Sequence, residues 1–520
     1  MTGTVVPNLT DISMCESTTG WSNLGGGTQS INDITVFDAK EGTYCLQDYK
    51  ASASTRGSEY DLGSNQDFSD VIVIMWFAFS KIYNATTPMR IRITDGDGDY
   101  AEWNIFTKDT LSHCGWIAWA LKPSVTPDTE SGTFDITIAR KVGWIVDGVL
   151  SKTYIYWDAV RYGYGLTIKG GTSGDPAKFE DFITSEATYA YGIVEKYNGV
   201  YYLQGQPKIG SLTNGEDTYF KDPNQIVQFK EMKGNPTGFY EIKGQGNATG
   251  ETKIFLGEKS GSVGISGCFI RAPSAMKWKL TMSDTNITEF GFYCCILVNA
   301  DTIIGQAYST VKEFLSTNFI ACAEVLPSTG IMKYCKFISS PGEAVRIDST
   351  SHNITNCDFI TCAIGVHITV NGPFTFNALS FSGCTYDGKN TYGSSVTVNY
   401  DQYCSPAPST YDPAGDEIVY QAAVTLIVRH VKTGNEPTEY VRCSIYRKSD
   451  MYEIMNKDAD VADEQTSGYY KASTSYTQTG ITVIIRARES GYLPFEMETT
   501  IASSGLDITA IWILDPNYTP

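Results

Sequence analysis

The fold is decided by one stretch, NCDFITCAIGVHI, which spans residues 356–368. Its two cysteines, Cys357 and Cys362, are five residues apart and stand among apolar and β-branched side chains, which favour strands. Two such cysteines can form a disulfide, bind a metal or pack in a core. Each alternative predicts a different protein, and the neighbouring segments distinguish between them.

Segments similar to this one recur on both sides of it. Their apolar landmarks are, in chain order, Phe269, Ile296, Phe319, Phe337, Phe359 and Tyr386. They recur at intervals of roughly twenty residues or a little more, and such a period, with short strands between Gly, Asn or Ser turns, is typical of a solenoid. We therefore predict a right-handed parallel β-helix over residues 166–403, with three short strands in each coil.

The cysteines take inward positions in this predicted solenoid. Cys335 and Cys357 each stand two residues before a landmark, Phe337 and Phe359, so the four residues should form a core stack. Cys is small and apolar and is among the most buried residue types. Disulfides and a metal site are the alternatives, but none of the thirteen cysteines forms a CxxC pair and no His or carboxylate recurs at ligand spacing. We expect packing, and neither a metal nor a cofactor.

The segment before the solenoid has strand and turn signals without the repeat. Residues 1–165 contain seven candidate strands, which fit an antiparallel β-sandwich of the jelly-roll type. The last of them, KTYIYWDAVRYG (152–163), resembles the closing strand of carbohydrate-binding and concanavalin-like modules. The end of a solenoid needs a cap. A helix near 175–187, with Pro176 at its first helical position and Phe179 and Phe182 on one face, would supply it.

The segment after the solenoid begins with CSPAPSTYDPAGDE, residues 404–417, which is rich in Pro, Ser and Gly and is predicted to be a linker. Residues 418–520 then give six or seven alternating strands, which suggest a small immunoglobulin-like sandwich. The predicted fold class is therefore all-β throughout.

One acidic stretch, RITDGDGDYAEW (92–103), has the spacing that opens a calcium-binding EF-hand loop. The twelfth position of that loop should be a bidentate Glu, but it is Phe106 here. The stretch also lies between two strands, where Asp-Gly pairs make tight turns. We expect a hairpin, with a surface calcium site as the alternative.

The composition excludes several classes of function. A net charge of −19 argues against binding to a nucleic-acid backbone, which requires clustered Lys and Arg. No apolar run reaches the length of about 18 residues that a membrane-spanning helix needs, so we expect none. The N-terminal MTGTVVPNLTD lacks a basic region followed by an apolar run, so we expect no signal peptide.

Several stretches resemble known sequences. TYFKDPNQIVQFKEM (218–232), IMKYCKFISS (331–340) and STSHNITNCDFI (349–360) are similar to predicted structural proteins of marine tailed phages. VIIRARESGYLPFE (483–496) resembles the C-terminal immunoglobulin-like sandwich modules of phage virion proteins. The resemblance implies a protein on the exterior of the virion, in the tail-fibre, tailspike or head-decoration class, whose partners are other virion proteins and a host surface glycan. It brings no catalytic motif.

A glycan-depolymerising tailspike enzyme is the alternative function. Hydrolysis of a glycan needs two opposed carboxylates, and Glu343 and Asp348 are the candidates, near Asp358 on the predicted coils. The outward positions are mostly Thr, Ser, Asn and Lys, and no GxSxG motif is present. We therefore expect a non-enzyme. A secreted adhesin is a third class, and the expected lack of a signal peptide counts against it.

Four residues are candidates for binding a glycan or a protein partner. Trp116 and Trp119 are three apart in a predicted strand and should point to opposite faces, so one of them would be exposed. Arg346 and His367 occupy matching coil positions, in AVRI and GVHI, and should stack on the outer face. We also expect a homo-oligomer, with a trimer favoured over a monomer, because flat repeating faces can meet their copies along a long seam.

Overall fold

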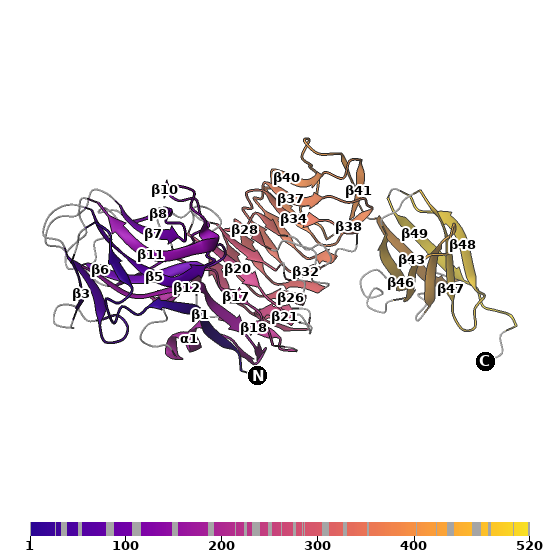
Figure 1. Ribbon diagram of the computed structural model, residues 1–520. Coiled ribbons are helices and arrows are strands. Elements are labelled where there is room, and N and C mark those ends of the chain that lie inside the picture. Colours follow the sequence, from indigo (N-terminus) through magenta and orange to yellow (C-terminus); the bar gives the residue numbers. More distant parts are fainter. Residues whose placement is uncertain are drawn as a thin grey trace. The chain divides into compact units, whose positions relative to one another are not determined.

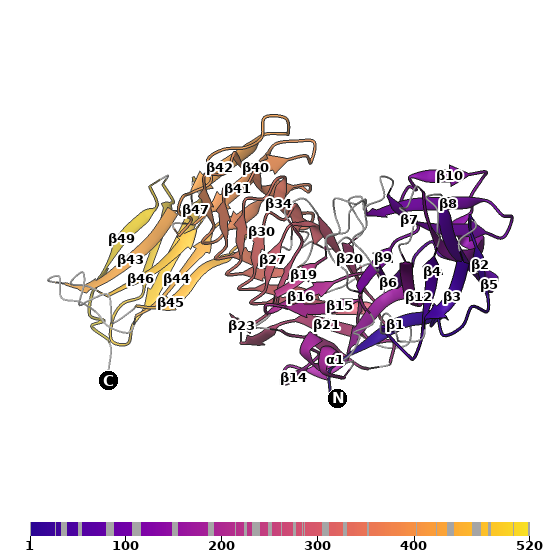
Figure 2. The ribbon, with the colours of Figure 1, turned by 90° about the vertical axis from the view of Figure 1, so that its left-hand side faces the viewer.

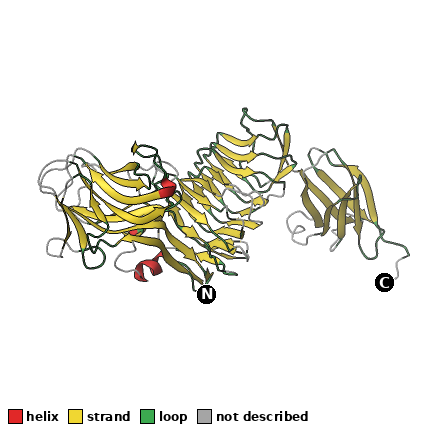
Figure 3. Ribbon diagram, in the orientation of Figure 1, coloured by secondary structure: helices red, strands yellow, loops and turns green. Residues whose placement is uncertain are grey.

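The structure is a computed structural model of the chain, and its regular secondary structure is almost wholly β-strand (Figures 1 and 3). The described residues are 2–517 apart from 26–27, 33–38, 50–54, 80–87, 107–115, 148–153, 186–191, 214, 223–225, 231–239, 248–251, 262, 274–276, 283, 285, 304–310, 326–329, 351–352, 402, 423, 434–440, 460–469, 477–479 and 503. The prediction of an all-β chain is confirmed, since the helices among the described residues are the short α1 (Phe179–Ser185) and the 3-10 turn η1 (Ile136–Ile138). None of the described helices is long and apolar enough to span a bilayer.

The chain forms two compact units. The first comprises Met1–Ile347, Ser351–Asn353 and Thr361–Ala363, and the second comprises the remaining residues through Pro520.

The first unit begins with two sheets packed face to face. One sheet orders its strands β10-β8-β7-β11-β5-β2, and the other contains β1, β3, β4, β6, β9 and β12. Between them lies an apolar core in which the rings of Trp144 and Trp157 stack with centroids 4.5 Å apart. The strands are β1 (Thr4–Ser13), β2 (Trp21–Asn23), β3 (Thr28–Asn32), β4 (Cys45–Tyr49), β5 (Arg56–Gln66), β6 (Ile72–Phe79), β7 (Met89–Asp95), β8 (Tyr100–Phe106), β9 (Ile117–Leu121), β10 (Thr129–Ser131), β11 (Ala139–Val146) and β12 (Tyr154–Lys169).

The expected boundary at residue 165 falls inside β12, and this correction changes how the unit is built. The first half of β12 pairs antiparallel with β4 and β6, whereas Thr167 and Ile168 pair parallel with Lys208 and Ile209 of β17 (Lys208–Ile209). One strand of 16 residues is therefore shared by the two-sheet sandwich and by the repeat that follows. Gly163 is required here because a Cβ atom would lie 2.3 Å from the Asn8 carbonyl oxygen of β1.

The repeat is a succession of coils, each of which adds one strand to three parallel sheets. We call them the lateral sheet (β16-β19-β24-β27-β30-β33), the shared sheet (β12-β17-β20-β25-β28-β31-β34) and the hairpin sheet (β18-β21-β26-β29-β32). Their further strands are β15 (Val194–Tyr197), β16 (Val200–Leu203), β18 (Thr218–Phe220), β19 (Ile226–Phe229), β20 (Tyr240–Gly244), β21 (Thr252–Leu256), β24 (Phe269–Arg271), β25 (Trp278–Thr281), β26 (Ile287–Tyr293), β27 (Ile296–Val298), β28 (Ala300–Ile303), β29 (Val311–Leu315), β30 (Asn318–Ile320), β31 (Glu324–Val325), β32 (Ile331–Lys333), β33 (Lys336–Ile338) and β34 (Glu343–Ile347). A hairpin of β22 (Glu258–Ser260) and β23 (Val263–Ser266) is inserted before β24.

The central side chain of each lateral strand points inward and stacks on the next coil. Phe319 pairs with Phe337 in register, and their rings lie 4.9 Å apart at an interplanar angle of 6°. In the second unit Phe359 stacks in the same way on Phe381, at 4.9 Å and 7°. Each of the two predicted core aromatics is thus fully buried and stacked on the neighbour within its own unit.

From β27 onward, the coils turn at corners of one residue in the left-handed conformation, and these residues are not glycine except for Gly383 after β39. The corner before β30 is Ser316 (φ 55°), and the corner after it is Ala321 (φ 52°). Their backbone N–H groups donate to the carbonyls of Lys333 and Ile338 on the next coil, at 2.9 and 2.8 Å. The equivalent corners of other coils are Cys294, Asn299, Tyr334, Ser339, Asn356, Thr361 and Ala378.

The twelve cysteines that are described are free thiols. Six of them stand directly after a corner, namely Cys295, Cys322, Cys335, Cys357, Cys362 and Cys384. The Sγ of Cys335 donates to the carbonyl oxygen of Phe314 at 3.4 Å, and those of Cys322 and Cys362 donate to Leu297 and Phe337 at 3.3 and 3.4 Å. Cys357 is likewise fully buried. Burial raises the pKa of the Cys322 thiol to about 12, so it stays protonated and can donate. The cysteines fill the core and also satisfy backbone carbonyls where the chain bends.

Helix α1 covers the first coil, but it begins later than expected. Asp175 and Pro176 are not the helix start. They form β14 (Asp175–Pro176), which pairs antiparallel with β13 (Gly171–Thr172). The Asp175 N–H donates to the Thr172 hydroxyl at 3.1 Å and closes this hairpin, which displaces the helix start to Phe179. The Phe179 ring then packs on Tyr201 and Phe220 of the first coil.

The second unit continues with the strands β35 (Asn353–Thr355), β36 (Asp358–Ile360), β37 (Ile364–Ile368), β38 (Phe374–Phe376), β39 (Ser380–Ser382), β40 (Tyr386–Asn390), β41 (Val396–Tyr400) and β42 (Ile418–Ala422). Residues 404–417 do not form the predicted linker. The Asp387 carboxylate accepts the N–H groups of Ser409 and Thr410 at 2.7 and 2.9 Å, and Phe381 donates its N–H to the Pro406 carbonyl. This segment therefore covers the last coil, whose exposed backbone edge needs partners.

The C-terminal sandwich begins at β43 rather than at residue 418, because β42 still pairs parallel with β41. Its two sheets are β46-β43-β49 and β45-β44-β47-β48, around an apolar core that includes Trp512. The strands are β43 (Val424–Lys432), β44 (Arg442–Arg447), β45 (Glu453–Asp458), β46 (Tyr470–Tyr476), β47 (Thr482–Arg488), β48 (Phe495–Thr500) and β49 (Leu506–Trp512).

We predict that Ala321→Gly raises the free energy of unfolding by up to about 1 kcal/mol. Glycine removes a left-handed penalty of roughly 1–2 kcal/mol and costs about 0.5–1 kcal/mol of chain entropy. Ala323, two residues further along and outside the left-handed region, is the matched control, and Ala323→Gly should be destabilising. Urea denaturation followed by tryptophan fluorescence measures both. Equal destabilisation by the two variants would contradict the conclusion that Ala321 carries a left-handed backbone penalty.

We also predict that the C-terminal sandwich loses stability on acidification. His430 of β43 is fully buried, and in the described part of the chain neither ring nitrogen has a hydrogen-bond partner. Burial lowers the pKa of His430 to about 4 from an ordinary value near 6.5. The unfolded state binds the proton more tightly, so about 3 kcal/mol of stability should disappear as the pH falls from about 6.5 to about 4.

The variant His430→Phe should flatten this pH dependence, because it removes the titrating group from an apolar site beside Trp512. Thermal melts of the full chain between pH 4 and pH 7 measure the effect. An unchanged slope in the variant would show that other groups control the acid transition.

Candidate functional site

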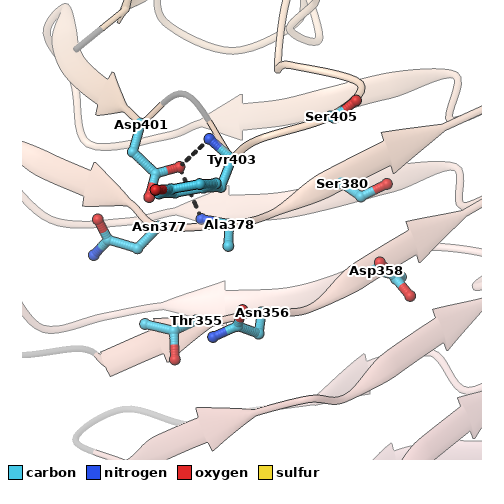
Figure 4. Close-up of a pocket in the computed structure, with 9 residues that line it drawn as sticks. All are labelled: Thr355, Asn356, Asp358, Asn377, Ala378, Ser380, Asp401, Tyr403 and Ser405. Carbon is cyan, nitrogen blue, oxygen red and sulfur yellow. Dashed lines mark hydrogen bonds between the residues drawn. The ribbon is translucent and has the colours of Figure 1, made fainter. Parts of the chain in front are cut away.

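The candidate site is an open groove on the coils of the second unit, with a volume of about 730 Å³ (Figure 4). It is formed where three successive passes of the chain around the coils make the same corner. The first pass supplies Thr355, Asn356 and Asp358, the second Asn377, Ala378 and Ser380, and the third Asp401, Tyr403 and Ser405.

The repeat fixes where these side chains lie. Asn356 and Ala378 are both left-handed corners, and Asp358 and Ser380 open the strands β36 and β39, which pair in register. Because both pairs have the same spacing along the chain, equivalent side chains stack on the outside as the aromatic rings do inside. The result is a ladder of short polar groups along the coils.

Asp401 holds the third pass against the second. Its Oδ1 accepts the backbone N–H groups of Ala378 and Tyr403, both at 3.0 Å (Figure 4). It also accepts the Cys404 thiol at 3.4 Å. Burial raises the pKa of that thiol to about 11, which keeps the proton available for this bond. Asp401 is therefore a positioning residue for the aromatic side chain next to it.

Tyr403 gives the groove its aromatic surface. The side chain is 68% exposed, although it is large and apolar. The other lining groups are amides, hydroxyls and the carboxylates of Asp358 and Asp401, and the described lining contains no Lys, Arg or His. An exposed ring beside many neutral hydrogen-bonding groups suits an uncharged, hydroxyl-rich ligand.

A second cavity, of about 220 Å³, lies in the first unit between the hairpin sheet and the β22–β23 hairpin. Its walls are aromatic, with Tyr219 and Phe255 rings 4.9 Å apart. Several of its polar groups are already paired: the Tyr293 hydroxyl donates to Glu313 at 2.9 Å, and Lys259 also contacts Glu313. This cavity is the packing seam of an inserted hairpin, and the groove is the better candidate.

The structure places the predicted tryptophan pair in two different apolar clusters. Trp119 packs against the sandwich core, and Trp116 packs on a small cluster around Cys45 and Tyr156. They lie on opposite faces, and both are half-buried rather than fully exposed. Binding of a glycan or a partner at this pair stays a prediction.

Arg346 and His367 belong to separate units. Arg346 of β34 forms an ion pair with Glu324 on the preceding coil, at 3.2 Å. The Nε2 of His367 in β37 lies 2.9 Å from the Thr391 hydroxyl. The alternative catalytic pair is divided in the same way, with Glu343 in the first unit and Asp348 in the second.

The DGDGD stretch is a hairpin turn between β7 and β8. The Asp95 carboxylate accepts four backbone N–H groups, from Asp97, Gly98, Asp99 and Asp135, at 2.9 to 3.0 Å. Its oxygens are therefore engaged by the turn itself. Among the described residues, no group of three His, Cys, Asp or Glu side chains could hold a metal ion.

The closing strand β12 of the sandwich carries a buried charge network. Arg161 contacts Glu41 at 2.8 and 2.5 Å and Asp11 at 2.7 Å. The Asp158 carboxylate accepts the N–H groups of Lys40 and Glu41, and burial raises its pKa to about 7. Asp158 and Arg161 are almost fully buried, so the network anchors the residue 39–44 loop and does not face a ligand.

Comparisons with known proteins find no match to a family model and none to a curated protein. Among solved structures, a family 11 carbohydrate-binding module from Clostridium thermocellum, in complex with a β-1,3-1,4-mixed-linked tetrasaccharide, is 12% identical with a TM-score of 0.23, over 31% of this chain and 96% of the module. The CBM22-1 xylan-binding domain of Paenibacillus barcinonensis is 14% identical with a TM-score of 0.19, over 30% and 95%. An exo-β-agarase is 14% identical with a TM-score of 0.23, over 30% of this chain but only 24% of the agarase. Likeness at these levels carries no conclusion about ligand or activity.

Proposed function

We propose that the chain is a non-enzymatic structural protein on the exterior of a tailed-phage virion, as a tail fibre, tailspike or head decoration, and that it binds a neutral host glycan in the groove around Tyr403. In this proposal the coils are a right-handed parallel β-helix between a jelly-roll sandwich and an immunoglobulin-like sandwich. Its partners are other virion proteins and further copies of itself. The observation that carries the glycan part is the groove itself, with an exposed ring beside stacked neutral polar groups.

The chemistry of the groove favours a sugar over other ligands. A sugar ring has an apolar face that stacks on an aromatic side chain and an edge of hydroxyl groups that exchange hydrogen bonds with amides and hydroxyls. Tyr403 offers the first, and Asn356, Asn377 and Ser380 offer the second. Two carboxylates and no cation in the described lining disfavour uronic acids and sulfated sugars.

The same geometry argues against hydrolysis in this groove. A glycosidase needs one carboxyl as acid and a second as base or nucleophile. The Oδ1 of Asp401 accepts two backbone N–H groups and a thiol, which makes it part of the scaffold. Asp358 would therefore have to hydrolyse a glycan without Asp401 as the second catalytic carboxyl. A glycan-depolymerising tailspike, acting through Glu343 or Asp348, stays the alternative function.

The virion part predicts that the protein co-purifies with particles. Mass spectrometry of density-gradient-purified phage should detect it, and an antibody against the C-terminal sandwich should label intact particles. Detection only in particle-free culture supernatant would contradict the proposal and favour a secreted adhesin.

The glycan part predicts that Tyr403→Ala weakens binding to a neutral polysaccharide about tenfold, because the loss of a central aromatic contact costs roughly 1.4 kcal/mol or more. Tyr197 of β15 is 67% exposed, against 68% for Tyr403, so Tyr197→Ala is a matched control and should bind as the wild type does. Affinity electrophoresis in gels that contain a glucan, a galactan, a mannan or alginate measures both.

Two results would overturn this part. Binding that Tyr403→Ala leaves unchanged would exclude the groove, and preferential binding of alginate would exclude a neutral ligand. Oligosaccharides released by the wild type but not by Glu343→Ala or Asp348→Ala would establish the depolymerase instead.

A further inference from the structure

The outer face of the lateral sheet carries apolar side chains in a regular arrangement. The two outward columns of this face contain Ile226, Phe269 and Ile296 in one and Val298, Ile320 and Ile338 in the other, each residue in register with the next. Parallel strands place such neighbours about 4.8 Å apart. We call these six residues the outward stripe. Strands β16, β19, β27 and β30 of this sheet face the viewer in Figure 2.

The stripe is accessible, since all six side chains are half-buried rather than buried. The inward residues of the same strands, such as Phe319 and Phe337, are fully buried. The lateral sheet is therefore apolar on its inner face, which borders the core, and also along the stripe on its outer face.

The charge distribution indicates what covers this face. The chain has 58 acidic and 39 basic residues and a net charge of −19, so two copies repel one another over most of their surface. The polar residues among the outward positions of β19 to β33 are Gln228, Arg271, Asn318 and Lys336, without a carboxylate. Arg271 donates to the Gln228 side chain at 2.8 Å. This is a surface on which an acidic chain can meet its own copy without repulsion.

We propose that the outward stripe is the surface through which copies of this chain pack together in a homo-oligomer. This inference is independent of glycan binding. A second copy is the occupant that matches best, because its ladder has the same spacing and a closed symmetry presents the same patch from each subunit. The five strands from β19 to β33 make the stripe about 20 Å long. An interface of standard size buries roughly 800 Å² per partner, so the stripe is its apolar centre, and corner residues such as Tyr334, 47% exposed, extend it.

Mass photometry of the full chain tests the association. The mass of one chain is 57.1 kDa, so a trimer is expected at three times this mass and a dimer at twice this mass. Either oligomer supports the proposal if the stripe variants below dissociate it. A single species with the mass of one chain, at micromolar concentration, overturns it.

The stripe is tested by placing the same charge inside and outside it. Ile320 in β30 is half-buried in the stripe, and Ile265 in β23 is an exposed isoleucine outside it. Ile320→Glu should convert the oligomer to a monomer, and Ile265→Glu should leave it assembled, with unchanged circular dichroism in both. Dissociation by Ile265→Glu, or persistence of the oligomer in folded Ile320→Glu, overturns the assignment of the face.

Cross-linking provides a test that does not disturb the apolar residues. Asn318, which lies between Ile296 and Lys336 in the first column, can be replaced by Cys, and Lys333 of the hairpin sheet serves as the control position. Of the twelve described native cysteines, ten are buried, which keeps the background low. Oxidation should link copies of Asn318→Cys on a non-reducing gel and leave Lys333→Cys as a single chain. The opposite pattern, or no link at either position, overturns the proposal.

Discussion

The structure depends on how the chain bends between its strands. A coil can repeat only if each bend is short and leaves no backbone group without a partner. Corners of one left-handed residue, such as Ser316 and Ala321, make the bend and donate their N–H groups to the next coil. The small side chain that follows, a thiol at Cys322 and Cys362, donates to a carbonyl of the previous coil. Aromatic stacking inside and polar ladders outside both follow from this constraint, because it keeps all coils in register.

The sequence predicted the repeat well, because its period records which positions stack. The sequence-based prediction was wrong where the local composition suggested an irregular segment but the backbone pairs with strands that are distant in the sequence. The predicted domain boundary at residue 165 lies inside β12, where Gly163 permits the close approach of β1. Residues 404–417 look like a linker because proline is rare in regular strands. Their carbonyl and N–H groups nevertheless pair with the last coil, for example from Pro406 to Phe381.

The candidate site was harder to predict than the fold. The spacing of Trp116 and Trp119 predicts that one ring is exposed, but both are half-buried, and each packs on a cluster in the sandwich. The groove residues occupy corners, where the alternation of inward and outward positions is interrupted. One signal was present in the sequence: Phe359 has an equivalent in Phe381 one coil later, which places Ser380 at the position of Asp358. Tyr403 lies beyond the last landmark of the repeat, Tyr386, so no repeat marks it.

The continuous strand β12 has a mechanical consequence. Its first half is hydrogen-bonded to β4 and β6 and its last residues to β17, so tension applied to the sandwich passes directly into the coils through a covalent backbone. Separating the two requires breaking the hydrogen bonds of β12 with β17 or those of β12 with β4 and β6. Resistance to a pulling force is governed by the rate of unfolding. Under a pulling force, the sandwich and the coils of the first unit therefore behave as one rigid body.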